Sequence, residues 1–169
     1  MAVKSLIETV TVGAGGAASI EFTGIPQDGS DLLLVVSARY VNNSRHGDVT
    51  INGTSTGYAS LRLQGSGSAV SSNSFPLNDL PNLVGVGNPG NATSNTFGNT
   101  QITFSNYTSS ANKSVAIDGV TENNATEAYQ LLYAGSWSNT DAITSIAWSN
   151  GVSNIVQYST ASLFKIKYD

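Results

Sequence analysis

The chain has 169 residues, a length that suits one domain with a substantial hydrophobic core. It contains no cysteine and a single histidine, His46, which excludes disulfides, thiolate metal sites, cysteine nucleophiles and a histidine-rich metal cluster. Seven Lys and Arg residues against eleven Asp and Glu residues give a net charge of −4 without a basic run, so we expect no nucleic-acid partner.

The chain also lacks the sequence features of a membrane protein. Its longest strictly apolar run, residues 32–36, is far shorter than the roughly 20 residues that a helix needs to cross a bilayer. Residues 1–8 lack the apolar stretch of a secretory signal peptide. We therefore expect no membrane partner.

Alternating apolar and polar residues in the first third of the chain predict short β-strands. Residues 6–12 and 19–22 alternate on either side of a glycine-rich turn, which predicts a β-hairpin. Residues 32–41 begin with a continuous apolar run, which predicts a central strand buried on both faces. Residues 49–51 end at Asn52-Gly53, a pair that favours a hairpin turn.

The same alternation continues to the C-terminus. Further strands are predicted at 58–63, 100–104, 114–120, 128–137, 143–148 and 162–168. Residues 122–132 also contain helix-forming residues, but their period of two fits a strand, which is the prediction adopted here. Many short strands with Gly and Asn turns predict an all-β antiparallel β-sandwich of jelly-roll type, with little or no helix, in one domain spanning 1–169.

Residues 65–99 depart from this order because they are rich in glycine, serine and asparagine over a length that is unusual for a loop. The segment also carries the apolar residues Phe75, Leu77, Leu80, Leu83 and Val84. Two interpretations stay open. Either residues 83–86 form a short extra strand that packs on the same domain, or the segment is an arm that docks on a neighbouring subunit.

Two glycine motifs, at 85–90 and 13–18, match the spacing of dinucleotide-binding loops. The first lacks a following helix and a downstream acidic residue, and the second runs into a strand pattern, so both are interpreted as turns. Asp28 and Asp31 carry oxygen ligands suited to calcium, but they lack the spacing of an EF-hand. We therefore expect no cofactor and no metal.

The sequence also offers few residues that could catalyse hydrolysis. His46 lies in the polar stretch 42–48 and is interpreted as a solvated turn residue rather than as a catalytic base. Glu122 and Glu127 lie five residues apart, but nothing in the sequence sets the separation that a glycosidase pair needs. These observations predict that the protein is not an enzyme.

Aromatic side chains permit two interpretations. Tyr129, Tyr133 and Trp137 share one strand parity, and Trp148 ends another predicted strand. Such rings can form a sugar-binding platform, but they more often fill the core of a sandwich, and the core interpretation is preferred.

Several short stretches resemble a family of small tailed-phage virion proteins that includes head decoration, or cement, proteins. These stretches are 6–9, 25–26 followed by 31–39, 95–99, 112–115, 121–129 and 137–140. The resemblance covers nearly the whole chain and implies a β-sandwich that sits as a homotrimer on an assembled capsid. It supplies no catalytic residues. The charged end 165–169 differs from the shorter apolar ends of the family.

The resemblance implies a structural protein on the outer capsid surface of the virion. Its partner would be the major capsid protein, whose assembled lattice it would stabilise by bridging capsomers. Two alternatives stay open: a tail-fibre-tip or receptor-binding module that recognises host-surface glycans, and a glycan-degrading enzyme. Exposed aromatic rings in a groove would favour the first, and a carboxylate pair in a cleft would favour the second.

Candidate partner-contact residues come from three regions, 2–8, 43–48 and 75–84. They are Ala2, Val3, Lys4, Ser5, Leu6, Arg45, His46, Phe75, Leu77 and Leu80. The N-terminal segment is the preferred contact because a strand-like arm can add to the sheet edge of a neighbour through main-chain hydrogen bonds. The alternative, in which residues 6–12 pair only within their own sandwich, stays open.

Overall fold

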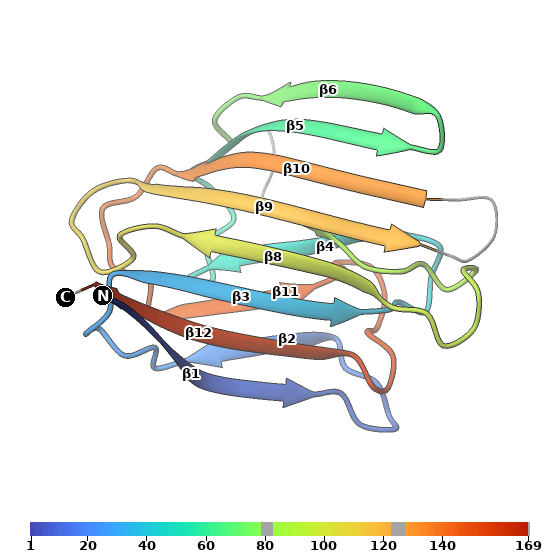
Figure 1. Ribbon diagram of the computed structural model, residues 1–169, viewed down its shortest axis with the longest axis horizontal. Helices are drawn as coiled ribbons and strands as arrows, with labels where there is room; N and C mark the ends of the chain where they lie inside the picture. The colour runs from blue at the N-terminus through green and yellow to red at the C-terminus, as the bar shows by residue number, and fades with distance from the viewer. Residues whose placement is uncertain (79–82, 123–127, 169) are drawn as a thin grey trace.

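Antiparallel strands form almost all of the regular structure in the computed structural model, which describes residues 1–78, 83–122 and 128–168 (Figure 1). The strands are β1 (Ala2–Thr11), β2 (Ser19–Thr23), β3 (Asp31–Ala38), β4 (His46–Ile51), β5 (Tyr58–Ser66), β6 (Ala69–Phe75), β7 (Leu83–Val86), β8 (Gly98–Phe104), β9 (Lys113–Glu122), β10 (Ala128–Trp137), β11 (Ser145–Ser149) and β12 (Thr160–Tyr168). These described residues contain no helix, so none is long and apolar enough to cross a membrane. The predicted all-β class is confirmed.

Two sheets of unequal size make up the sandwich. The large sheet has the strand order β1-β12-β3-β8-β9-β10-β5-β6, and the small sheet has the order β2-β11-β4-β7. The small sheet lies behind the large one in Figure 1 and covers one of its faces. Eight strands therefore face four, so the large sheet extends beyond the small one at its β1 and β6 edges.

The core lies between the two sheets and is built from every second residue of each strand. In β3 the side chains of Leu32, Leu34 and Val36 are fully buried, while the intervening residues are half-buried. On the other side of the core, the small sheet contributes Ile146 and Trp148, which are also buried. This alternation is the one that a sheet with a single covered face imposes.

Glycines in the small sheet make room for two large rings. The ring of Trp148 and the hydroxyl of Tyr40 occupy the space that a Cβ at Gly47 would need. A Cβ at Gly85 would lie 2.7 Å from Trp148, and one at Gly87 would lie 2.7 Å from Tyr40. The glycine motif at 85–90 was interpreted as a turn, but its first residue, Gly85, belongs to strand β7. Gly85 therefore serves the packing of the core rather than a turn.

Both predicted hairpins in the first third of the chain are wrong. β1 pairs with β12 in the large sheet, whereas β2 pairs with β11 in the small sheet. Asn52 and Gly53 do form a turn, with φ angles of 51° and 65°, but β4 before it and β5 after it lie in different sheets. An Asn-Gly pair favours a reversal of the chain but does not determine which strand follows. Here the chain crosses from one sheet to the other after the turn.

Two further predictions are refined. β3 is central in the large sheet but buried on one face, because the small sheet covers only that side. The segment 65–99 is not one long loop, since it contains β6, β7 and the start of β8. The extra strand that one of the two open interpretations placed at 83–86 is present as β7, whereas β6 was not predicted from the sequence.

Candidate functional site

The N-terminal candidate residues form an edge strand. β1 pairs with β12 from Ala2, opposite Tyr168, to Thr11, opposite Thr160, with one irregularity between Leu6 and Glu8. The structure therefore pairs this segment with β12 of its own sheet, and among the described strands none pairs with the other edge of β1. Ala2, Val3, Lys4, Ser5 and Leu6 are all exposed.

Leu6 and Lys4 lie on the face of the large sheet that points away from the small sheet. Leu6 is directly opposite Phe164, and the Nζ atom of Lys4 lies 4.1 Å from the centroid of the Phe164 ring. Phe164 is in turn opposite Leu33 of β3. The N-terminal group is therefore continuous with this outer face of the sheet.

A second group of candidates gathers around β10, on the inner face. The Cζ atom of Arg45 lies 5.5 Å from the ring centroid of Tyr129, a distance typical of a cation–π contact. Phe75, at the end of β6, stacks on Tyr133 with centroids 6.4 Å apart, and the Cζ atom of Arg62 lies 5.2 Å from the Phe75 ring. Sequence order separates Arg45 from Phe75, but the fold places both against the same strand.

His46 begins β4 and is exposed. Desolvation and the positive charges of Arg62 and Arg45 hold the pKa of its imidazole below the ordinary value of 6.5. Leu77, just after β6, is also exposed, and Leu80 lies outside the described residues. The ten candidates therefore do not form one site, because the β1 group lies at the opposite edge of the large sheet from Phe75 and Leu77.

The outer face of the large sheet was not predicted as a site. Two neighbouring rows of directly opposed residues cross it from β5 through β10 and β9 to β8: Leu61, Ala134, Ala116 and Thr103 in one row, and Leu63, Leu132, Asp118 and Gln101 in the other. Together with Ile117 and Tyr133 they line a shallow hollow of about 380 Å³. Within these two rows Asp118 is the single charged residue.

The side chains of this face are only half covered. Leu61 and Leu63 are each 50% exposed, Leu132 is 44% exposed and Val120 is 47% exposed. The first row continues from Thr103 through Leu33 and Phe164 to Leu6 on β1. We name this surface, from Leu61 and Leu63 across to Leu6, the outer face.

A signal for the outer face was present in the sequence. Leu131-Leu132 and Leu33-Leu34 place apolar side chains on both parities of one strand, a pattern that means either burial on both sides or an exposed apolar face. Pattern alone does not separate these outcomes. The number of strands in the covering sheet decides between them, and it is a property of the tertiary structure.

The predicted core role of the aromatic residues is confirmed. Tyr129, Tyr133, Trp137 and Trp148 are all buried. The hydroxyl of Tyr129 contacts Oε1 of Gln64 at 2.8 Å, so its polar end has a partner on β5. These four rings therefore do not form an exposed platform.

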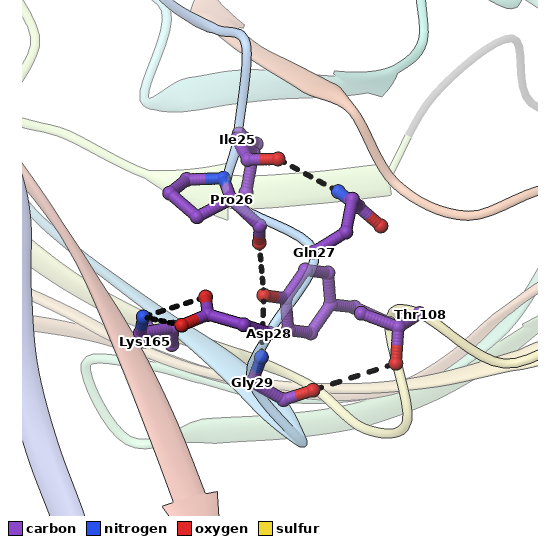
Figure 2. Close-up of polar contacts among 8 residues, drawn as sticks. Ile25, Pro26, Gln27, Asp28, Gly29, Thr108 and Lys165 are labelled. Atoms are coloured by element: carbon purple, nitrogen blue, oxygen red, sulfur yellow. Dashed lines mark hydrogen bonds and ion pairs between the residues drawn. The ribbon is translucent and has the colours of Figure 1, made fainter.

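The two aspartates considered for calcium make structural contacts instead, and Figure 2 shows those of Asp28. Nζ of Lys165 lies 2.6 and 2.8 Å from the carboxylate oxygens of Asp28, and this contact lowers the pKa of Asp28. Asp31 accepts hydrogen bonds from the backbone N–H of Asn106 and the hydroxyl of Tyr168, each at 2.8 Å. Among the residues that the structure describes, no group of three or more His, Asp and Glu side chains lies together.

The carboxylate pair considered for glycan hydrolysis cannot be placed in the fold. Glu127 lies outside the described residues, and the side chain of Glu122 at the end of β9 is not described either.

No protein-family model matches the chain, and no curated protein matches it in sequence. Two solved structures align with it weakly. A protein of unknown function from Shewanella oneidensis MR-1 is 12% identical, with 96% of this chain and 75% of that chain covered and a TM-score of 0.27. The CBM2 module of the evolved Dit of Lactobacillus casei BL23 phage J-1 is 11% identical, with 89% and 69% covered and a TM-score of 0.19. Both likenesses are too weak to carry an argument, so the family remains a resemblance in sequence.

Proposed function

We propose that the chain is a structural virion protein of the capsid decoration, or cement, type. As a homotrimer on the outside of a phage head, it binds the assembled lattice of the major capsid protein and stabilises that lattice by bridging neighbouring capsomers. The single observation that supports this proposal best is the outer face, where half-exposed leucines of the neighbouring strands β5 and β10 lie side by side. Monomeric proteins rarely expose contiguous apolar patches larger than a few hundred Å².

The shape and chemistry of the outer face suit a protein partner. The hollow is shallow, and it is lined by aliphatic side chains together with the polar groups of Gln101, Thr103 and Asp118. Protein interfaces combine an apolar centre with scattered hydrogen-bonding groups in this way. The proposed bridging role requires that each bound copy contact two neighbouring capsomers.

Binding to an assembled lattice is sufficient to reinforce it. A protein that binds the assembled state and not the free subunits stabilises the assembled state by mass action. Many weak contacts repeated over a head also act together, since each bridge holds two neighbours at a high effective concentration. The role needs no catalytic group and no cofactor.

The glycan-recognition alternative gains no support from the described residues. It depends on exposed aromatic rings in a groove, whereas Tyr129, Tyr133, Trp137 and Trp148 are buried in the core. We therefore propose one function.

The test is co-sedimentation of the purified chain with heads assembled from the major capsid protein of the phage that encodes it. We compare the wild-type chain with Leu63→Lys on the outer face and with Thr50→Lys on the solvent side of the small sheet. The wild type and Thr50→Lys should sediment with heads, and neither should bind unassembled subunits. Leu63→Lys should weaken binding at least about tenfold, because a charge enters an apolar contact.

Circular dichroism and urea unfolding check that both variants are folded. Leu63 is half-exposed, so its substitution leaves the core intact. A wild-type chain that does not bind heads contradicts the proposed function, and a Leu63→Lys chain that binds like the wild type contradicts the assignment of the contact to the outer face.

A further inference from the structure

β6 is an edge strand with none of the features that usually prevent edge pairing. It forms one edge of the large sheet and pairs with β5 on its other side (Figure 1). Its seven residues, Ala69–Phe75, include no charged residue and no proline, and all except Phe75 are exposed. Val70 is 83% exposed. Natural edge strands commonly carry a charge, a proline or a bulge, because an open edge otherwise accepts another strand.

The other described edges differ from β6 in this respect. β1 carries Lys4 and Glu8 and an irregularity in its pairing between Leu6 and Glu8. β2, at one edge of the small sheet, carries Glu21. β7, at the other edge of the small sheet, is buried along its whole length. β6 is therefore the one open edge of the described sheets that carries neither charge nor irregularity.

The turn before β6 determines which of its backbone groups point outward. Ser66 and Ala69 are opposed across the two-residue turn Gly67-Ser68, in which Gly67 has a φ of 56°. A pair that closes a two-residue turn exchanges hydrogen bonds, and hydrogen-bonded and non-hydrogen-bonded pairs then alternate along the ladder. The N–H and C=O groups of Val70, Ser72 and Ser74 accordingly point away from β5.

We propose that β6 pairs antiparallel with β6 of a second copy of the chain, about a twofold axis at Ser72, so that two large sheets become one continuous sheet. The pairing places Val70 opposite Ser74 of the second copy and Ser72 opposite its counterpart. About six main-chain hydrogen bonds can form between the outward groups. The contact is isologous, since each strand presents the same surface to the other.

The side chains next to the axis are compatible with this pairing. On the inner face, Asn73 lies opposite Ser71 of the second copy, so a hydrogen bond between these two side chains is possible. Arg62, the nearest charged residue on β5, is opposite Asn73 and donates a hydrogen bond to its Oδ1 atom at 2.9 Å. In this arrangement the backbones of the two copies of Arg62 are three strand spacings apart, about 14 Å.

A second copy is a better occupant than β1 of another molecule, because Lys4, Glu8 and the irregularity of β1 interrupt a regular ladder. The contact goes beyond the proposed function, because it requires no capsid. On a head, it would join neighbouring decoration proteins through twofold contacts.

An edge contact between two single strands falls below the area of a standard stable interface, so we expect dissociation constants of roughly 0.1–1 mM in solution.

The test is sedimentation equilibrium of the purified chain from about 10 μM to about 1 mM, a range that spans the expected dissociation constant. The wild-type weight-average mass should rise toward twice its low-concentration value. Ser72→Lys places like charges opposite each other at the axis and should raise the dissociation constant at least about tenfold. The matched control Thr11→Lys, at the exposed end of β1, should associate like the wild type.

A charge-swap experiment separates pairing at Ser72 from a general loss of association. A mixture of Ser72→Lys and Ser72→Asp should associate again, although the Lys variant alone does not. Amide hydrogen exchange gives a second readout, since association should protect the amides of Val70, Ser72 and Ser74, whereas those of Ser71 and Asn73 are already bonded to β5 in the single chain.

Three results would overturn the proposal. The first is a wild-type mass that stays constant over the whole concentration range. The second is a Ser72→Lys variant that associates like the wild type, which would show that the copies meet at another surface. The third is a mixture of the two charged variants that fails to associate, even though the wild type does.

Discussion

Gly47, in strand β4 of the small sheet, lies against the rings of Trp148 and Tyr40. A Cβ at this position would overlap the ring of Trp148 and the hydroxyl of Tyr40. We expect Gly47→Ala to lower the free energy of unfolding by about 1–3 kcal/mol, the usual cost of overpacking a core. Gly65→Ala in β5 is the matched control, because a Cβ there meets no atom within 4 Å.

Urea unfolding of both glycine variants measures this effect. The control should stay within about 0.5 kcal/mol of the wild type, since a surface substitution away from special features rarely does more. Equal stability of Gly47→Ala and the wild type would show that the rings move aside at little cost.

Asp48 predicts a pH-dependent stability. Burial raises the pKa of its carboxyl from 3.8 to about 6, so the folded state favours the protonated form. The contribution of Asp48 to stability is therefore most favourable below pH 4 and is lost as the pH rises through 6. One pKa unit corresponds to about 1.4 kcal/mol, and with allowance for partial exposure we expect a loss of about 1–2 kcal/mol.

The measurement is the stability difference between Asp48→Asn and the wild type at pH 4 and at pH 7.5. The asparagine variant should gain relative to the wild type by about 1–2 kcal/mol between these pH values, because it cannot ionise. The lowered pKa of His46 acts in the opposite direction but is common to both proteins, so it cancels in the comparison. A difference that is the same at both pH values would contradict the raised pKa.

One tyrosine, Tyr107, holds the connection between β2 and β3, and Figure 2 labels the residues Pro26 and Gly29 of this connection. The hydroxyl of Tyr107 donates a hydrogen bond to the carbonyl of Pro26 and accepts one from the backbone N–H of Gly29 at 3.2 Å. We expect Tyr107→Phe to destabilise the protein by about 1–3 kcal/mol, because it leaves two part-buried backbone groups without this partner.

The matched control is Tyr158→Phe, since Tyr158 is 69% exposed. Urea unfolding should place this control within about 0.5 kcal/mol of the wild type. If Tyr107→Phe is as stable as the control, water replaces the hydroxyl and the connection does not depend on it.

Strand positions were predictable from the sequence, but strand partners were not. The alternation in β1 and β2 identifies both strands, yet they lie in different sheets and pair with β12 and β11. Alternation reports only that one face of a strand is buried. The choice of partner depends on contacts with residues more than a hundred positions away, which a local pattern does not contain.

Two strands, β6 and β3, were not predicted correctly. The polar composition of β6 gives no strand pattern, and the two-sided apolar pattern of β3 was misinterpreted. β6 consists mainly of serine and asparagine and is exposed on both faces, so it shows no alternation and was missed. β3 was predicted to be buried on both sides, whereas the four-stranded sheet covers only one of its faces. The outer face was missed because Leu61 and Leu63 alternate with Arg62 and Gln64, as in a strand with one buried face, whereas in the fold these leucines lie on the exposed face.

The two proposed contacts use different surfaces of the protein. The outer face would contact the capsid, and the β6 edge would contact a second copy of the chain. A trimer that also forms twofold contacts through β6 can extend over a surface, because threefold and twofold contacts together link each molecule to more than one neighbour. The two proposals fail independently, since one requires heads and the other requires only the purified chain.

The most direct test of the proposed reinforcement is the temperature at which heads release their packaged genome, followed by the fluorescence of a DNA-binding dye. Heads that lack the chain are compared with heads decorated with the wild type and with the Leu63→Lys variant. We expect the wild type to raise the release temperature by several degrees and the variant, which binds poorly, to leave it close to that of bare heads. Release at the same temperature with and without bound wild-type chain would contradict the claim that the protein reinforces a capsid.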